Sequence, residues 1–138
     1  MVKWLKQIYY ISKIIPICIG VWSLMKIAVV GSRGLTVSDL GKYLPEGVSE
    51  IISGGAKGID TCAKMYALSS GIKLTEILPE YEKYGKSAPL RRNIEIIESA
   101  DMVLAFWDGV SRGTGHVIDS CKSRGIPLKV FLIAGHKK

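Results

Sequence analysis

The sequence predicts an α/β fold: a single Rossmann-like, doubly wound and mostly parallel sheet of five strands, with helices on both faces. From Met25 onward, continuous apolar runs alternate with segments of helical periodicity. Such runs are typical of strands that are buried on both faces. Three of the strand–helix junctions also place glycine beside hydroxyl or cationic side chains. At 138 residues, one domain with one sheet is the simplest arrangement.

The strands follow from the apolar runs and the residues that end them. They are expected at Lys26–Val30, Val48–Ile52, Lys73–Leu78, Met102–Trp107 and Pro127–Ile133. A polar loop from Glu80 to Ala88 is long for a strand–helix connection, which makes it a candidate binding loop or lid.

Helices are expected between the strands. A short helix should reach about Leu44 from a cap at Thr36 or Ser38, and the last should run from Gly113 or Thr114 to Gly125. The helix that ends at Gly71 should bury Ile59, Cys62, Ala63, Tyr66 and Ala67. The helix that begins at Pro89 should bury Leu90, Ile94, Ile97 and Ala100.

Residues 1–24 do not fit this alternation. We treat them as an apolar extension of a domain at residues 25–134, which is followed by a tail at residues 135–138. The extension is a candidate membrane anchor, docked helix or upstream extension of the reading frame. We favour the last, because Met25 directly precedes the first strand and the apolar run is short for a membrane span.

Charge and cysteine spacing limit the class of partner. Of the formal charge of +7, three units come from Lys3, Lys6 and Lys13. The remaining excess suits a small anionic ligand better than a long nucleic acid. The three cysteines are widely spaced, so we expect no disulfide framework, no metal site and a cytoplasmic protein.

The stretch Ser53-Gly54-Gly55-Ala56-Lys57-Gly58-Ile59-Asp60 joins an expected strand to an expected helix. Glycines permit a sharp turn and close approach of a ligand, and a helix N-terminus presents unpaired N–H groups to an anion. The alternative is a tight turn that binds nothing. Asp60 would either cap the helix or accept a hydrogen bond from a sugar hydroxyl.

Two further junctions carry similar chemistry, Gly31-Ser32-Arg33 and Ser111-Arg112-Gly113-Thr114. In a doubly wound sheet, loops that follow the strand carboxyl ends meet at one crevice. Arg91 and Arg92 are expected in the first turn of a helix, where they oppose its dipole. A bound anion would remove that conflict, although both side chains could simply be solvated.

Several familiar sites lack their sequence patterns. There is no Gly-x-Gly-x-x-Gly fingerprint, no P-loop and no Gly-x-Ser-x-Gly elbow. The two histidines, His116 and His136, give little support for a catalytic triad or a histidine metal site. We therefore expect no cofactor.

Five segments together resemble the YspA/YpsA-related SLOG family: Gly31-Ser32-Arg33, Ser53-Gly54-Gly55-Ala56-x-Gly58-x-Asp60, Ala88-Pro89-x-x-Arg92-Asn93, Ala105-Phe106-Trp107-Asp108-Gly109 and Arg112-Gly113-Thr114. This Rossmann-like superfamily also holds the DNA-processing protein A proteins and the Lonely guy (LOG) phosphoribohydrolases. The resemblance extends from Met25 to about Phe131.

The resemblance implies binding of a nucleotide or nucleotide-derived ligand in a sensor or regulatory role. Together with the junction chemistry, it gives thirteen candidate ligand-binding residues: Gly31, Ser32, Arg33, Ser53, Gly54, Gly55, Gly58, Asp60, Arg92, Asn93, Arg112, Gly113 and Thr114. The phosphoribohydrolases carry a glutamate three residues after the threonine, where this chain has Val117.

Two alternatives remain open beside binding alone. One is cleavage of the N-glycosidic bond of a nucleoside monophosphate, with Asp108, Asp60 and Arg92 as candidate catalytic residues; the other is binding of single-stranded DNA in the manner of the DNA-processing proteins. As partners we expect a nucleotide-derived small molecule, with a second copy of this chain as a further candidate and without a membrane or a long nucleic acid.

Overall fold

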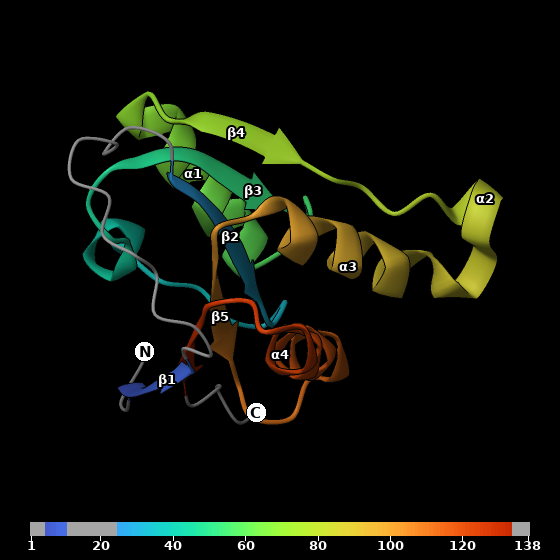
Figure 1. Ribbon diagram of the computed structural model, residues 1–138. Coiled ribbons are helices and arrows are strands. Elements are labelled where there is room, and N and C mark those ends of the chain that lie inside the picture. Colours follow the sequence, from blue (N-terminus) through green and yellow to red (C-terminus); the bar gives the residue numbers. More distant parts are fainter. Residues whose placement is uncertain (1–4, 11–24, 134–138) are drawn as a thin grey trace.

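The computed structural model describes residues 5–10 and 25–133, and five parallel strands form the centre of the fold (Figure 1). These strands are β2 (Met25–Gly31), β3 (Val48–Ser53), β4 (Lys73–Glu76), β5 (Met102–Trp107) and β6 (Leu128–Ile133). Their order across the sheet is β6-β5-β2-β3-β4. The expected Rossmann-like sheet is therefore confirmed.

The strand order reverses next to β2. The chain adds β3 and then β4 on one side of β2, and it returns to place β5 and then β6 on the other side. Loops that leave the carboxyl ends of β2 and β5 therefore run to opposite faces of the sheet. That divergence leaves a crevice, which is where open α/β sheets bind ligands.

A sixth strand, β1 (Leu5–Tyr10), lies outside the expected set. It pairs antiparallel with β6, from Leu5 opposite Ile133 to Tyr10 opposite Leu128. A docked helix is thus wrong for these six residues. Residues 1–4, 11–24 and 134–138 lie outside the described part of the chain, so the expectations of an anchor or a tail there stay predictions.

Helices cover both faces of the sheet, as expected. The helix α1 (Ile59–Ser70) and the 3₁₀ turn η1 (Leu40–Tyr43) lie on one face, and α3 (Ala88–Ser99) and α4 (Arg112–Arg124) lie on the other (Figure 1). Both α1 and α4 end at a glycine in the left-handed conformation, Gly71 and Gly125. The short helix expected up to Leu44 is only the four-residue η1.

Two apolar layers hold these elements together. The sheet lies between the two layers, and successive side chains of β2 point into opposite ones. Ile27 and Val29 pack towards α1, whereas Ala28 and Val30 pack towards α3 and α4. On the α1 side, Tyr43, Phe106 and Phe131 form a ring cluster with centroids 4.9–5.2 Å apart.

The segment between β4 and α3 differs from the expectation. The loop expected from Glu80 to Ala88 contains α2 (Tyr81–Tyr84) and a 3₁₀ turn, η2 (Gly85–Ser87). The first turn of α3 projects with α2 beyond the sheet, so no strand lies beneath it (Figure 1). Leu90 is consequently 45% exposed, and α3 instead buries Ala88, Ile96 and Ile97. The expected burial of Leu90 is wrong.

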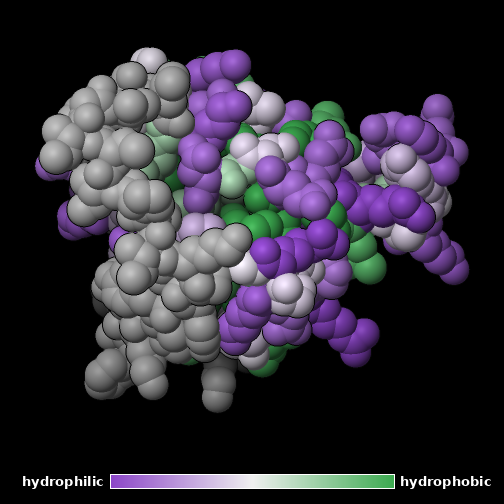
Figure 2. Space-filling view, in the orientation of Figure 1, coloured by the Kyte–Doolittle hydropathy of each residue, from purple (hydrophilic) through white to green (hydrophobic). Residues whose placement is uncertain are grey.

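The surface seen in Figure 2 is mixed. The projecting α2 end is mostly hydrophilic, while hydrophobic surface shows between hydrophilic side chains nearer the centre of this face. Among the residues that the structure describes, every helix is too short or too polar to cross a membrane.

Candidate functional site

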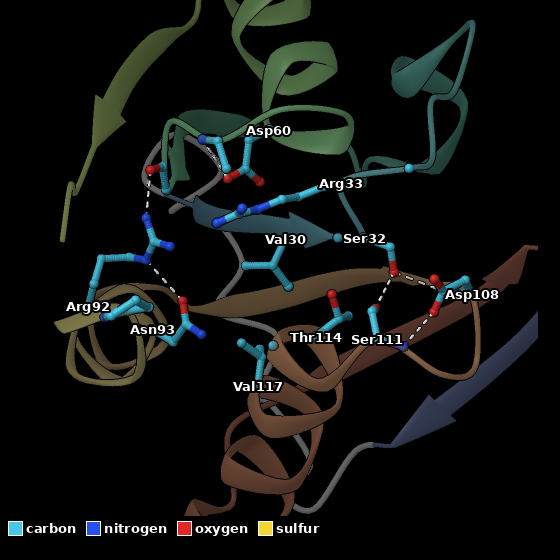
Figure 3. Close-up of a pocket in the computed structure, with 16 residues that line it drawn as sticks. Val30, Ser32, Arg33, Asp60, Arg92, Asn93, Asp108, Ser111, Thr114 and Val117 are labelled. Atoms are coloured by element: carbon cyan, nitrogen blue, oxygen red, sulfur yellow. Dashed lines mark hydrogen bonds between the residues drawn. The ribbon is translucent and has the colours of Figure 1, made fainter. Parts of the chain in front are cut away.

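A cavity of about 400 Å³ opens at the crevice beside the carboxyl ends of β2 and β5 (Figure 3). Its volume lies within the range of small-molecule sites. Sixteen residues line it: Val30, Gly31, Ser32, Arg33, Gly34, Gly54, Ala56, Asp60, Pro89, Arg92, Asn93, Asp108, Ser111, Gly113, Thr114 and Val117. They come from four separate segments, so the fold assembles the cavity from parts that are distant in the sequence.

The segment after β2 supplies a buried hydroxyl and an exposed cation. The Ser32 N–H continues the sheet by donating to the Phe106 carbonyl at 3.0 Å, and this holds Ser32 at 3% exposure. Arg33 is exposed at the cavity, and its guanidinium has no hydrogen bond or ion pair with any described residue. It is therefore available to a ligand.

The glycine turn between β3 and α1 approaches this segment closely. Gly58 has a φ of +72°, and a Cβ there would collide with the backbone carbonyl of Arg33. Within the turn, the Ala56 N–H donates to Asp60 Oδ2 at 3.0 Å, and the Gly55 N–H donates to Ser53 Oγ at 3.4 Å. These two amides are thus occupied by the turn itself.

Arg92 reaches the cavity from the second turn of α3. Its Nη1 donates to the carbonyls of Gly54 at 2.6 Å and Ile77 at 3.4 Å, and its Nε donates to Asn93 Oδ1 at 3.0 Å. The expectation that Arg92 lies in the first turn is wrong, because α3 begins at Ala88. The backbone contacts fix the guanidinium in place, while its remaining N–H donors are left for a ligand.

The opposite side of the cavity carries hydroxyl and carboxylate groups. Ser32 Oγ lies 2.5 Å from Ser111 Oγ and accepts the Asp108 N–H at 3.3 Å. Asp108 Oδ1 accepts the N–H groups of Val110 at 2.9 Å and Ser111 at 2.8 Å. The Trp107 indole donates to the Ser111 carbonyl at 2.9 Å, which further fixes this loop.

The titratable groups of the cavity are shifted in different directions. Burial raises the pKa of Asp60, although the Ala56 N–H and the nearby Arg92 oppose that effect. Burial also lowers the pKa of Arg92, while Asp60 opposes it. Burial alone would raise the pKa of Asp108, but the N–H groups of Ser111 and Val110 outweigh it, so this carboxyl ionises more readily than usual.

Most of the residues predicted from the sequence meet at this cavity. They are Gly31, Ser32, Arg33, Gly54, Asp60, Arg92, Asn93, Gly113 and Thr114, together with the candidate catalytic residue Asp108. Four do not line it: Ser53 is fully buried, Gly55 and Gly58 shape the turn, and Arg112 is exposed at the start of α4. No cluster of metal-ligand side chains occurs among residues 5–10 and 25–133.

Six lining residues were absent from the prediction: Val30, Gly34, Ala56, Pro89, Ser111 and Val117. Ser111 could have been included, because it stands in the same junction as Gly113 and its hydroxyl is of the expected kind. Val30 and Val117 carry no polar group, so only their positions beside the crevice identify them.

Comparison with known proteins gives a family match and a relative. The family model described as DNA recombination-mediator protein A matches residues 3–106. The chain is also 36% identical over 87 residues to the Gene 61 protein of Mycobacterium phage D29, an alignment that covers 59% of this chain and 70% of the phage protein. No solved structure gives a significant match.

Proposed function

We propose a function for this chain on the basis of its family, since it belongs to the DNA recombination-mediator protein A family within the SLOG superfamily. The proposed function is that the cavity at the edge of its sheet binds a nucleotide or nucleotide-derived ligand. We further propose that binding serves a sensor or regulatory role. The ligand's phosphate would contact the two arginines of the cavity.

The observation that carries this proposal is the convergence of Arg33 and Arg92 on one cavity from different elements. Neither guanidinium forms an ion pair with a carboxylate of the described residues. Two guanidinium groups in one concave site, neither of them in an ion pair with a described carboxylate, favour an anionic ligand, and a planar guanidinium suits phosphate oxygens.

The floor of the cavity supports binding without hydrolysis. Val117 is 2% exposed and lines the cavity at the position where the phosphoribohydrolases carry a glutamate. An isopropyl group cannot stabilise a developing positive charge or move a proton. Incubation with each nucleoside monophosphate should release no free base, and base release that disappears in Asp108→Ala would overturn the binding-only proposal.

A thermal-shift screen over nucleoside monophosphates, cyclic nucleotides and ADP-ribose tests the proposal. A ligand that binds only the folded protein at about a hundred times its Kd adds about 2.7 kcal/mol of stability, which raises Tm. Arg33→Ala should lose this shift with little change in the Tm of the free protein, because the exposed Arg33 guanidinium makes no hydrogen bond or ion pair with any described residue.

Lys57→Ala is the matched control, since it removes an exposed cation that does not line the cavity. The Lys57→Ala variant should keep the ligand-induced rise in Tm. A screen without any shift, or a shift that Arg33→Ala retains, would contradict the proposal.

Family membership favours single-stranded DNA as a second candidate ligand. DNA binding through phosphate contacts weakens steeply with salt. Fluorescence anisotropy with a labelled deoxythymidine oligonucleotide at two salt concentrations measures it. Affinity that falls with salt and is lost in Arg33→Ala would favour this candidate over a free nucleotide.

A further inference from the structure

The cavity has two chemically different ends, and the arginines account for only one of them. In Figure 3, Arg92 and Asn93 lie on one side of Val30, whereas Ser32, Ser111 and Asp108 lie on the other. The second end contains no cation, and it combines two hydroxyls with a carboxylate. A phosphate would meet electrostatic repulsion there, so this end must serve a different part of the ligand.

The cluster of Ser32, Ser111 and Asp108 is held by hydrogen bonds within the protein itself. Ser32 is fixed at the end of a buried strand, and Ser111 is fixed through its own N–H and through its carbonyl. Two N–H donors hold Asp108 Oδ1 at 2.8 and 2.9 Å. Groups held in this way lose little freedom on binding, which favours selectivity.

The unused hydrogen-bonding capacity of the cluster points to a hydroxyl ligand. Two serine hydroxyls have two donor protons, and the bond between them uses one. An ionised carboxylate has about four acceptor positions, and the two N–H groups occupy two of them. The serine hydroxyls also hydrogen-bond the Asp108 carboxylate, so the capacity left to the cluster is mainly that of acceptors, which complements the donor proton of a sugar hydroxyl.

The other acid of the cavity is less suited to this task. Asp60 is 7% exposed, and its Oδ2 accepts the Ala56 N–H within the glycine turn. Asp60 does not cap α1 either, since that helix has no side-chain cap at Gly58, and its Oδ2 instead holds the turn that precedes the helix. A carboxylate that binds ribose hydroxyls is a familiar device in dinucleotide-binding folds.

We propose that Ser32, Ser111 and Asp108 form a sugar-hydroxyl subsite, so that the cavity selects ribonucleotides over deoxyribonucleotides. This inference rests on the proposed nucleotide binding and makes it more specific. It also separates the two candidate ligands, because DNA lacks the 2′-hydroxyl that the subsite would bind.

Isothermal titration of the full chain with AMP, GMP, CMP and UMP and with their 2′-deoxy counterparts tests the inference. The ribonucleotide that binds best should bind about tenfold or more tightly than its deoxy form, which corresponds to a charge-assisted hydrogen bond of about 1.4 kcal/mol. Asp108→Asn should reduce this preference to about twofold, because the asparagine oxygen can still accept the two backbone N–H groups while the charge that strengthens the bond to the sugar hydroxyl is lost.

Ser111→Ala provides a second variant that needs no change at the Asp108 turn, and it should reduce the preference in the same direction. Asp119 is an exposed acid on α4 that does not line the cavity, so Asp119→Asn should keep the preference for the ribonucleotide. Equal affinity of the unmodified protein for both sugars would overturn the inference but leave the proposed function standing, as would a preference that survives in both variants. Absence of any nucleotide binding would overturn both.

Discussion

At the scale of single residues, the site depends on two aspartates that the sequence alone could not separate. Asp60 follows the glycine turn and Asp108 directly precedes Gly109, and both were candidates for the same chemistry. The turn's own hydrogen bonds distinguish them, since Asp60 Oδ2 faces the Ala56 N–H and Asp108 Oδ1 faces two N–H groups of its loop. Such local pairing depends on the exact course of the backbone, which residue types and their spacing do not specify.

The raised pKa of Asp60 predicts that the stability of the protein depends on pH. Because burial raises its folded-state pKa above 3.8, the folded protein holds this proton more tightly than the unfolded chain does. The free energy of unfolding therefore falls as pH rises from about 3.8 through the folded-state pKa. Asp60→Asn removes that dependence, so its stability relative to the unmodified protein should increase between about pH 3.5 and 7 in urea unfolding.

Asp108→Asn is the control of opposite sign. The pKa of Asp108 lies below 3.8 in the folded protein, so its contribution to stability is present above 3.8 and is lost as pH falls through the folded-state value. The unmodified protein should therefore exceed this variant near neutral pH and approach it in acid. A constant stability difference for both variants would show that neither carboxyl is shifted.

The backbone conformation of Gly58 predicts that a side chain at this position destabilises the fold. Gly58→Ala places a Cβ against the backbone of Arg33 at a φ of +72°, and backbone atoms cannot move aside as a flexible side chain can. We expect a loss of about 1–3 kcal/mol in the free energy of unfolding, measured with denaturant. Gly113→Ala has no atom within 4 Å of its new Cβ and should cost nothing, gaining up to about 1 kcal/mol. Equal effects at both positions would contradict this account of the turn.

At the scale of elements, the sequence predicted the five parallel strands closely, because most of them contain an apolar run with a glycine or polar boundary. The less apolar β4 ends at Glu76, two residues before the predicted end at Leu78. It missed β1 because a strand of six residues at a sheet edge is recognised by its partner, β6, which is distant in the sequence. It likewise missed α2 and the exposure of Leu90, because both follow from how far α3 projects beyond the sheet. Periodicity shows which residues share a face, but not what lies opposite that face.

Arg92 connects α3 to two loops of the sheet edge, and this predicts a structural role beside ligand binding. In Arg92→Ala, the buried Gly54 carbonyl loses its 2.6 Å hydrogen bond, which should cost about 1–3 kcal/mol of unfolding free energy. Arg91→Ala is the matched control, since that guanidinium is exposed and interacts with the Tyr84 ring and the Ser87 hydroxyl, so it should cost at most about 1 kcal/mol. Equal losses would show that the Gly54 contact does not stabilise the fold.

At the scale of the whole molecule, the five-stranded parallel sheet should fold without the first 24 residues. A chain that begins at Met25 keeps both apolar layers and should retain the circular dichroism spectrum, but its β6 edge is left without the β1 pairing. Unpaired edges promote association between chains. We therefore expect a lower denaturation midpoint and concentration-dependent association in sedimentation, whereas an unfolded product would show that the extension belongs to the folding unit.

The central claim is that a nucleotide occupies the crevice where the strand order reverses, between the cationic and hydroxyl ends of one cavity. Amide chemical-shift mapping by NMR, with the nucleoside monophosphate that gives the largest thermal shift, locates the ligand directly. We predict that the perturbed amides fall in Gly31–Gly34, Gly54–Ala56 and Ser111–Thr114, and that Arg33→Ala abolishes the perturbation. Perturbations confined to the second cavity, which Leu78, Tyr84 and Arg91 line on the α2 side of α3, would contradict the account.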